Sequence, residues 1–324
     1  MDLSTKYLGI ELKNPLIVSS SKLTKDFDTI KFCAEMGAGA IVMKSVFEEQ
    51  MLADENLLHD QDSKYFWYPE AIEHIHQHSK EHVVGKMLEL ISNVKAKLNV
   101  PVIASINCVS DMEWPKFTSK FEEAGADAIE LNIALIPFDK YTTCDEINRR
   151  YIDILKSVKG NTKLPVSIKM GSYFTNLISM ANRMDEEGVD GLVLFNRYYR
   201  PDINIETEEI IKTNILSGPS EVTKSLRWVA LLSPMLKCDL AAGTGIHDYS
   251  GVVKQLLVGA KATQICSTLF KNGIAYIETI LFEMEQWMDR HDYQSVSDFQ
   301  GKIQKKYGNK IAKFERIQFM SKDS

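Results

Sequence analysis

Short, mostly apolar runs that each end on a polar residue recur along this chain, and they constrain the fold more than any other feature. The polar ends are Lys44, Asn132, Lys169, Asn196, the triplet Gly243-Thr244-Gly245 and the triplet Cys266-Ser267-Thr268. Strands of a parallel sheet are mostly apolar because helices cover both faces of the sheet. Enzymes of the α/β class carry their reactive groups where such strands end. The sequence therefore predicts a parallel sheet with a site for an anionic, hydrogen-bonding ligand at the strand tips.

The spacing of these runs predicts an α/β fold, a (β/α)8 TIM barrel. Eight strand candidates occur, at residues 15–20, 40–46, 102–107, 128–133, 165–170, 191–196, 239–242 and 262–266. Helical patterns separate most of them, and a glycine such as Gly125, Gly188 or Gly259 marks the step from helix to strand. No GxGxxG sequence follows the first strand, which argues against an open dinucleotide-binding sheet.

Two additions to the barrel are expected. Residues 5–12 alternate like an N-terminal β-hairpin with Gly9 at its bend. The connections 47–82 and 197–227 are long insertions at strand tips, where they would form walls or a lid over a site. No low-complexity linker interrupts the chain, so we expect residues 1–324 to form a single domain.

Charge and cysteine content limit the partners and the compartment. The formal net charge of −6 gives no case for nucleic acid, which usually requires a basic surface. The five cysteines are scattered without a CxxC pair, which argues against a disulfide framework and against a zinc or iron–sulfur site. The chain shows neither a signal-peptide pattern at its start nor an apolar stretch of the roughly 18 residues that span a membrane. We therefore expect a cytoplasmic protein.

The two lysines at strand tips have three possible roles. A lysine at a strand end is most often a solvated cation or part of an ion pair. In a barrel, however, Lys44 and Lys169 would both point into the same mouth, where they could hold an anionic ligand or the electron-rich edge of a reduced cofactor. A lysine desolvated there could instead form a Schiff base with a carbonyl substrate.

The other polar tips favour a hydrogen-bonding ligand with a phosphate. Asn132 and Asn196 each offer an acceptor and two donors, which suits a ring amide, although asparagines also cap their own loops. The loops after the last two strands of such barrels often bind phosphate, and here they carry glycines and hydroxyl groups.

A run of three histidines carries no metal assignment. His74 and His78 have the i, i+4 spacing of a metal pair, with His76 between them. No third ligand is evident, so a solvated helix face is the better interpretation and no metal is assigned.

Several of these segments occur together in the order typical of one family. They are Asn14-Pro15-Leu16-Ile17-Val18-Ser19-Ser20, Met43-Lys44-Ser45, Ser105-Ile106, Glu130-Leu131-Asn132, Ile168-Lys169-Met170, Phe195-Asn196, Gly243-Thr244-Gly245 and Gln264-Ile265-Cys266-Ser267-Thr268. Over nearly its whole length the chain resembles the dihydroorotate dehydrogenases, most of all the class 1 type. That resemblance implies an FMN-dependent oxidoreductase acting on the CH–CH bond of a dihydropyrimidine-like substrate in pyrimidine biosynthesis, and it implies a homodimer.

The resemblance also implies roles for individual residues. The expected FMN-binding residues are Ser19, Ser20, Lys44, Ser45, Asn132, Lys169, Gly218, Thr244, Gly245, Cys266 and Ser267. Among these, Lys169 would lie near the pyrimidine edge of the flavin, and Thr244, Gly245, Cys266 and Ser267 would hold the phosphate. Lys44, Asn132 and Asn196 would contact the substrate, with Lys44 also counted as catalytic.

The position of the catalytic base departs from the family pattern. The family's proton-removing cysteine or serine lies three residues after the strand-four asparagine, where this chain has Leu135, which cannot move a proton. Cys144 lies farther along the same loop and is the candidate replacement, with Asp139 and Tyr141 as alternatives.

Four readings therefore stay open from the sequence. The chain could oxidise dihydroorotate with a relocated base, or act on a different dihydropyrimidine or unsaturated compound. It could be a flavin-binding electron-transfer partner without a substrate of its own. It could also be a Schiff-base lyase that uses Lys44 or Lys169.

Overall fold

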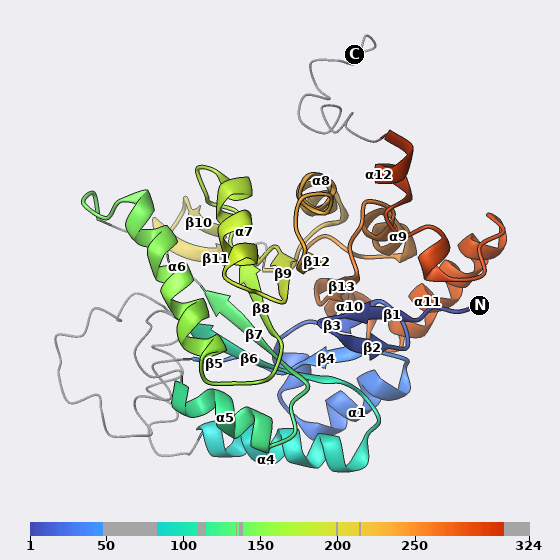
Figure 1. Cartoon of the computed structure of the whole chain (residues 1–324), viewed down its shortest axis with the longest axis horizontal. Coiled ribbons are helices and arrows are strands. Elements are labelled where there is room, and N and C mark those ends of the chain that lie inside the picture. Colours follow the sequence, from blue (N-terminus) through green and yellow to red (C-terminus); the bar gives the residue numbers. More distant parts are fainter. Residues whose placement is uncertain are drawn as a thin grey trace, which may run out of the picture.

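A closed barrel of parallel strands surrounded by helices forms the body of the computed structural model, as the sequence predicted (Figure 1). The structure describes residues 1–47, 83–108, 115–133, 135, 139–198, 200–213 and 215–307. The barrel strands are β3 (Leu16–Val18), β4 (Ala40–Val42), β6 (Val102–Cys108), β7 (Ala128–Ile133), β8 (Val166–Met170), β9 (Gly191–Leu194), β12 (Asp239–Gly243) and β13 (Ala262–Ile265).

The ring is closed by pairing between strands that are far apart in sequence. Each strand pairs in parallel with the next one along the chain, and β13 returns to pair with β3, so that Gln264 lies opposite Ile17. The short strand β5 (Val46–Phe47) extends the sheet beside the end of β6. All eight barrel strands therefore direct their carboxyl ends to one mouth, which gathers the residues that follow them.

Helices surround the ring of strands. They are α1 (Phe27–Glu35), α4 (Val83–Lys97), α5 (Pro115–Glu123), α6 (Cys144–Lys159), α7 (Leu177–Glu186), α8 (Val222–Leu232), α9 (Tyr249–Leu257), α10 (Ser267–Asn272), α11 (Tyr276–Asp289) and α12 (Lys302–Tyr307). Side-chain caps define several of their starts: the Asp26 carboxylate accepts the N–H of Thr29 at the start of α1, and the Asp248 carboxylate accepts that of Gly251 in α9. None of the described helices is long and apolar enough to cross a membrane.

The floor of the barrel is apolar and is closed by the predicted N-terminal hairpin. Strands β1 (Thr5–Tyr7) and β2 (Ile10–Leu12) pair antiparallel, and the turn at Leu8 and Gly9 has positive φ angles of 55° and 75°. Tyr7, Leu8 and Leu12 are buried against inward-facing strand residues, which are Ile17, Ala40, Val42, Ile103, Ala128, Val193, Ala241 and Ala262. The hairpin therefore acts as a plug at the amino end of the strands.

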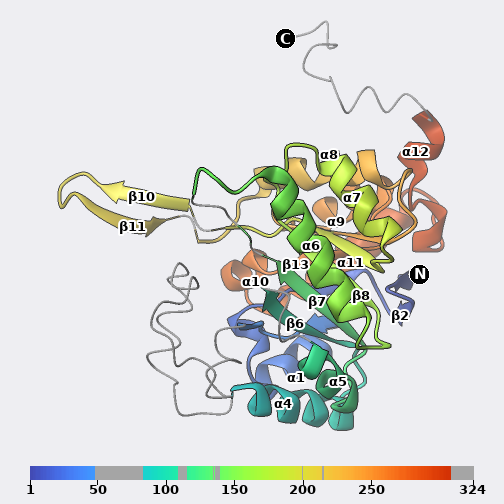
Figure 2. The same ribbon diagram turned by 60° about the vertical axis from the view of Figure 1, so that its left-hand side comes forward.

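The structure differs from the expected elements in two places. The strand expected at 40–46 is split into β4 and β5, with Lys44 between them. The connection 197–227 contains a hairpin that the sequence did not predict, β10 (Arg200–Asn204) with β11 (Glu209–Thr213), which projects away from the barrel (Figure 2). Ile203 and Ile210 lie opposite each other in this hairpin, but both side chains are exposed, so no buried stripe marked the strands. Residues 48–82, with the three histidines, lie outside the described residues.

Candidate functional site

A layer of polar side chains lies inside the barrel, one inward step above the apolar floor. Inward positions in a strand are two residues apart, so Glu130 follows Ala128 on β7 and Gln264 follows Ala262 on β13. Ser19 follows Ile17 in the same way. On β7, on β13 and at the end of β3, the inner face of the barrel thus changes from hydrocarbon to hydrogen-bonding groups within a single step.

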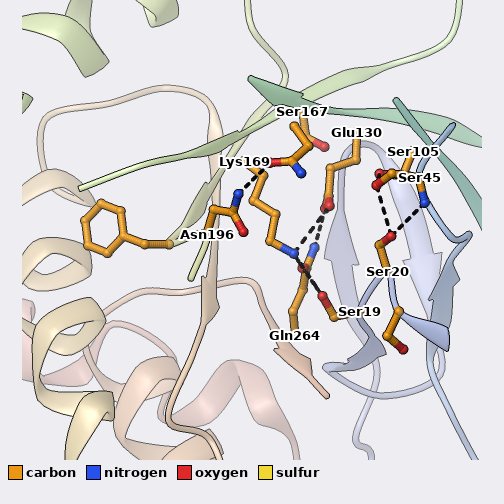
Figure 3. A network of polar contacts seen from close by, with 12 residues as sticks. Ser19, Ser20, Ser45, Ser105, Glu130, Ser167, Lys169, Asn196 and Gln264 are labelled. Carbon is orange, nitrogen blue, oxygen red and sulfur yellow. Dashed lines mark hydrogen bonds and ion pairs between the residues drawn. The ribbon is translucent and has the colours of Figure 1, made fainter. Parts of the chain in front are cut away.

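Lys169 is the centre of this layer (Figure 3). Its ammonium group donates to Ser19 Oγ and to Gln264 Oε1, both at 2.9 Å, and lies 3.6 Å from Glu130 Oε1. The Gln264 amide N–H donates in turn to Glu130 Oε2. The Lys169 side chain is 11% exposed and that of Glu130 is 1% exposed, so this is a buried cation held by a buried anion.

A second polar cluster lies beside it, just beyond the ends of β3 and β4 and on β6 (Figure 3). The Ser45 and Ser105 hydroxyl groups are 2.7 Å apart, and Ser20 Oγ both accepts the Ser45 N–H at 2.9 Å and lies 3.0 Å from Ser45 Oγ. Lys44, next to Ser45, is half-buried, and its backbone N–H donates to Thr24 O. Ser20, Lys44 and Ser45 are therefore brought to the same mouth as Lys169.

The two predicted asparagines also meet. Asn196 Nδ2 donates to Asn132 Oδ1 at 2.8 Å, which joins the tips of β7 and β9. Asn196 lines a cavity of about 220 Å³ together with Tyr198 and Lys224. Burial raises the pKa of Tyr198 to about 12, so its hydroxyl group stays protonated well above neutral pH.

The loop after β12 brings backbone to the mouth at very close range. Thr244 and Gly245 both have positive φ angles, 70° and 78°, and the Thr244 hydroxyl donates to Phe195 O at 3.0 Å. A Cβ atom on Gly245 would lie 2.2 Å from Val222 N, so only glycine fits there.

Ser217 ties this loop to its neighbours. Its Oγ accepts the Gly245 N–H at 3.3 Å and lies 3.3 Å from His247 Nε2, and its own N–H donates to Ser267 Oγ at 2.9 Å. Lys271 donates to Ser217 O at 2.7 Å. Backbone amides, hydroxyl groups and a cation converge here, which is the donor set that binds a phosphate.

The remaining predicted residues take three different positions. Cys266 precedes α10 and is partly exposed, and burial raises the pKa of its thiol. Gly218 donates its N–H to Glu221 Oε1 at 2.9 Å, next to Ser217. Cys144 is exposed in the first turn of α6, where its sulfur is 3.6 Å from Thr175 Oγ1. This contact joins it to the β8–α7 loop, and no contact among the described residues joins it to Lys169 or Asn132.

Leu135 is half-buried and packs against the outer hydrophobic core. The carbon side chain at this position therefore lies against other carbon side chains.

Sequence reasoning did not include Glu130, Gln264 or Ser217 among the site residues. The signal for the first two was present: each is a polar residue two positions beyond an alanine of a buried strand, with the period of an inward face. Ser217 carried no such signal, because its role depends on contacts with residues 28 and 50 positions away.

Comparison with known proteins decides the family. Residues 69–288 match the model of the family described as dihydroorotate dehydrogenase. The chain belongs to the dihydroorotate dehydrogenase family. The resemblance drawn from the strand-tip residues is thereby confirmed.

The relatives are distant but match along most of their length. The chain is 26% identical over 314 residues to the dihydroorotate dehydrogenase B (NAD(+)) catalytic subunit of Thermoplasma volcanium, covering 93% of this chain and 98% of the relative. The corresponding subunit of Methanocaldococcus jannaschii is 27% identical, over 87% of this chain and 92% of the relative. The NAD-dependent dihydropyrimidine dehydrogenase subunit PreA of Escherichia coli K12 is 22% identical, over 93% of this chain and 76% of the relative.

Proposed function

We propose that this chain is an FMN-dependent oxidoreductase that acts on the CH–CH bond of a dihydropyrimidine-like substrate. The observation that carries the proposal is the buried Lys169 ammonium at the barrel mouth, fixed by Ser19, Gln264 and Glu130. A fixed cation suits the electron-rich edge of a flavin, which gains negative charge on reduction. The names of the family and of the relatives, dihydroorotate and dihydropyrimidine dehydrogenases, support the same reaction class.

The residues at the mouth fit FMN. The missing Cβ atom of Gly245 lets this loop pack on the start of α8, and Ser217, Ser267 and Lys271 would offer hydroxyl and ammonium donors to a phosphate beside it. Thr244, Gly218 and Cys266 belong to the same group of loops. Ser19, Ser20, Lys44, Ser45 and Lys169 would then border the ring, and when bound, FMN would supply a two-electron acceptor.

The substrate would be oriented by the asparagine pair. Asn132 and Asn196 still have donors and acceptors beyond the bond they share, and these suit the alternating N–H and C=O groups of a pyrimidine ring. Lys44 would favour an acidic group on that ring. The adjoining cavity, with Tyr198 as a donor, gives room for a small molecule.

We propose Cys144 as the group that removes the neighbouring proton, since Leu135 cannot. Its exposed thiol would have to approach the substrate through a rearrangement of the loop before α6. Cys144→Ala is expected to abolish turnover of the substrate and leave FMN bound, and unchanged turnover would remove Cys144 from this role.

We further propose a cytoplasmic homodimer of a single FMN-binding domain. The scattered cysteines support the compartment, since the described cysteines Cys33, Cys144, Cys238 and Cys266 are all free thiols. The family resemblance supports the dimer.

The proposal is tested by the spectrum of the purified protein, followed by anaerobic reduction. A flavin spectrum that is bleached by dihydroorotate or by another dihydropyrimidine is the expected result. Bleaching by light but by none of these rings would indicate an electron-transfer role instead. A colourless protein that does not bind added FMN, but is inactivated by borohydride with a carbonyl compound, would overturn the proposal in favour of Schiff-base chemistry.

A further inference from the structure

We infer that Glu130 is a positioning residue that fixes Lys169 and partly offsets the positive charge that the FMN ring meets, an inference that rests on the proposed function. Figure 3 shows the Glu130, Gln264 and Lys169 side chains converging from β7, β13 and β8. The buried carboxylate would thereby control the reduction potential of a cofactor that it does not itself need to touch.

The two oxygens of the Glu130 carboxylate face different partners. Glu130 Oε2 accepts the Gln264 amide N–H, while Glu130 Oε1 faces the Lys169 ammonium at 3.6 Å. Glu130 Oε1 has no hydrogen-bond partner among the described residues, so its interaction with the ammonium is one of charge. The carboxylate thus acts on the lysine directly.

Glu130 also fixes the orientation of Gln264. A glutamine amide has one acceptor and one donor end. Because its N–H end is bound by Glu130, its Oε1 is turned toward Lys169 and accepts from it at 2.9 Å. The same oxygen accepts from Ser19 Oγ at 3.1 Å. Glu130 therefore positions the ammonium a second time, through Gln264.

Burial strengthens the interaction between Glu130 and Lys169. The Glu130 side chain is 1% exposed, so water does not screen its charge from the ammonium. Removing this charge while keeping the shape would leave the positive charge of Lys169 less compensated. A flavin gains negative charge on reduction, so reduced FMN should then bind relatively more tightly and the midpoint potential should rise.

The experiment compares the midpoint potential of bound FMN in the wild-type protein and in three variants. Glu130→Gln removes the charge and keeps an acceptor for Gln264. Glu130→Asp keeps the charge but draws it back toward β7. Asp190→Asn is the matched control, because it removes a carboxylate from the opposite end of the barrel, where Asp190 binds Lys159 at 2.6 Å and the Val166 N–H at 2.7 Å.

We expect Glu130→Gln to favour reduced over oxidised FMN by at least tenfold, a rise of about 30 mV for a two-electron couple. Glu130→Asp should raise the potential by a smaller amount, and Asp190→Asn should leave it unchanged. If Glu130→Gln does not fold, the Glu130→Asp variant decides: a wild-type potential there overturns the inference. An unshifted potential in a folded Glu130→Gln variant, or an equal rise in Asp190→Asn, also overturns it.

Failure of the proposed function would look different. A wild-type protein that binds no FMN in a fluorescence titration would overturn the proposed function and this inference together. A wild-type protein that binds FMN, with variants whose potentials do not move, would overturn the inference alone.

Discussion

The floor and the mouth of the barrel are one inward step apart on the same strands, yet they are built from opposite chemistry. At the floor, Ala128 and Ala262 pack around the Tyr7 plug. At the mouth, Glu130 and Gln264 on the same two strands hold Lys169. A barrel can therefore keep its stability at the amino end and place strained or charged groups at the carboxyl end, because each inward layer has its own set of neighbours.

The largest effect on stability is expected from a substitution in the floor. Tyr7→Ala should lower the free energy of unfolding by about 4 kcal/mol, since it removes a fully buried aromatic ring from a packed layer. The folded fraction should bind FMN with wild-type affinity, measured by urea denaturation and by FMN titration at low temperature. Loss of FMN affinity together with stability would mean that the two layers are not independent.

Lys169→Met removes the buried cation from the mouth. The variant leaves Glu130 buried without its cation, which should cost about 3 kcal/mol of stability, and it should weaken FMN binding at least tenfold. Lys159→Met is the matched control, because that lysine forms a partly exposed ion pair with Asp190 at the floor end, worth less than about 1 kcal/mol. Equal effects of the two variants on FMN affinity would contradict the assignment of Lys169.

Two glycines with positive φ sharpen the contrast further. Gly245→Ala at the mouth places a Cβ atom against the Val222 backbone, and it should cost about 2 kcal/mol and weaken FMN binding. Gly188→Ala, near the floor, has a φ of 81° but nothing within 4 Å of the added atom. It should cost about 1 kcal/mol for strain alone and leave FMN binding unchanged, which thermal melts and titrations would check.

The smallest effect is a pH dependence at the mouth. Burial, and then the nearby Lys271 cation, lower the pKa of His247 below its ordinary 6.5. The unfolded chain then binds more protons than the folded one, so stability should fall as the pH is lowered through the ordinary histidine pKa of 6.5. His247→Gln should remove this part of the slope in urea denaturation, while substitution of the exposed His291 should not. A slope that is the same in His247→Gln would refute the expected shift.

The features that could be predicted from sequence are those with a short period. The strand expected at 128–133 coincides with β7, and Gly125, expected at the step from helix to strand, has a positive φ of 93°. Lys169 was identified because it ends an apolar run. Local periodicity and turn chemistry decide each of these.

The features that could not be predicted depend on contacts between distant residues. The requirement for glycine at Gly245 comes from Val222, which approaches it from α8. The role of Glu130 depends on Gln264, 134 positions away. The hairpin β10–β11 lacks a buried face, so its sequence had no apolar stripe to reveal it.

The plug at the floor also has a consequence for biosynthesis. The N-terminal hairpin is bound to residues more than 200 positions farther along the chain. Leu8 donates its N–H to the Asp239 carboxylate at 2.8 Å, and the Thr5 hydroxyl donates to Lys261 O at 2.9 Å. A growing polypeptide on the ribosome thus carries an apolar hairpin whose binding place has not been made until some 260 residues have been joined. The ring of strands cannot close until β13 has been made, and until then the hairpin is exposed to chaperones and to its neighbours.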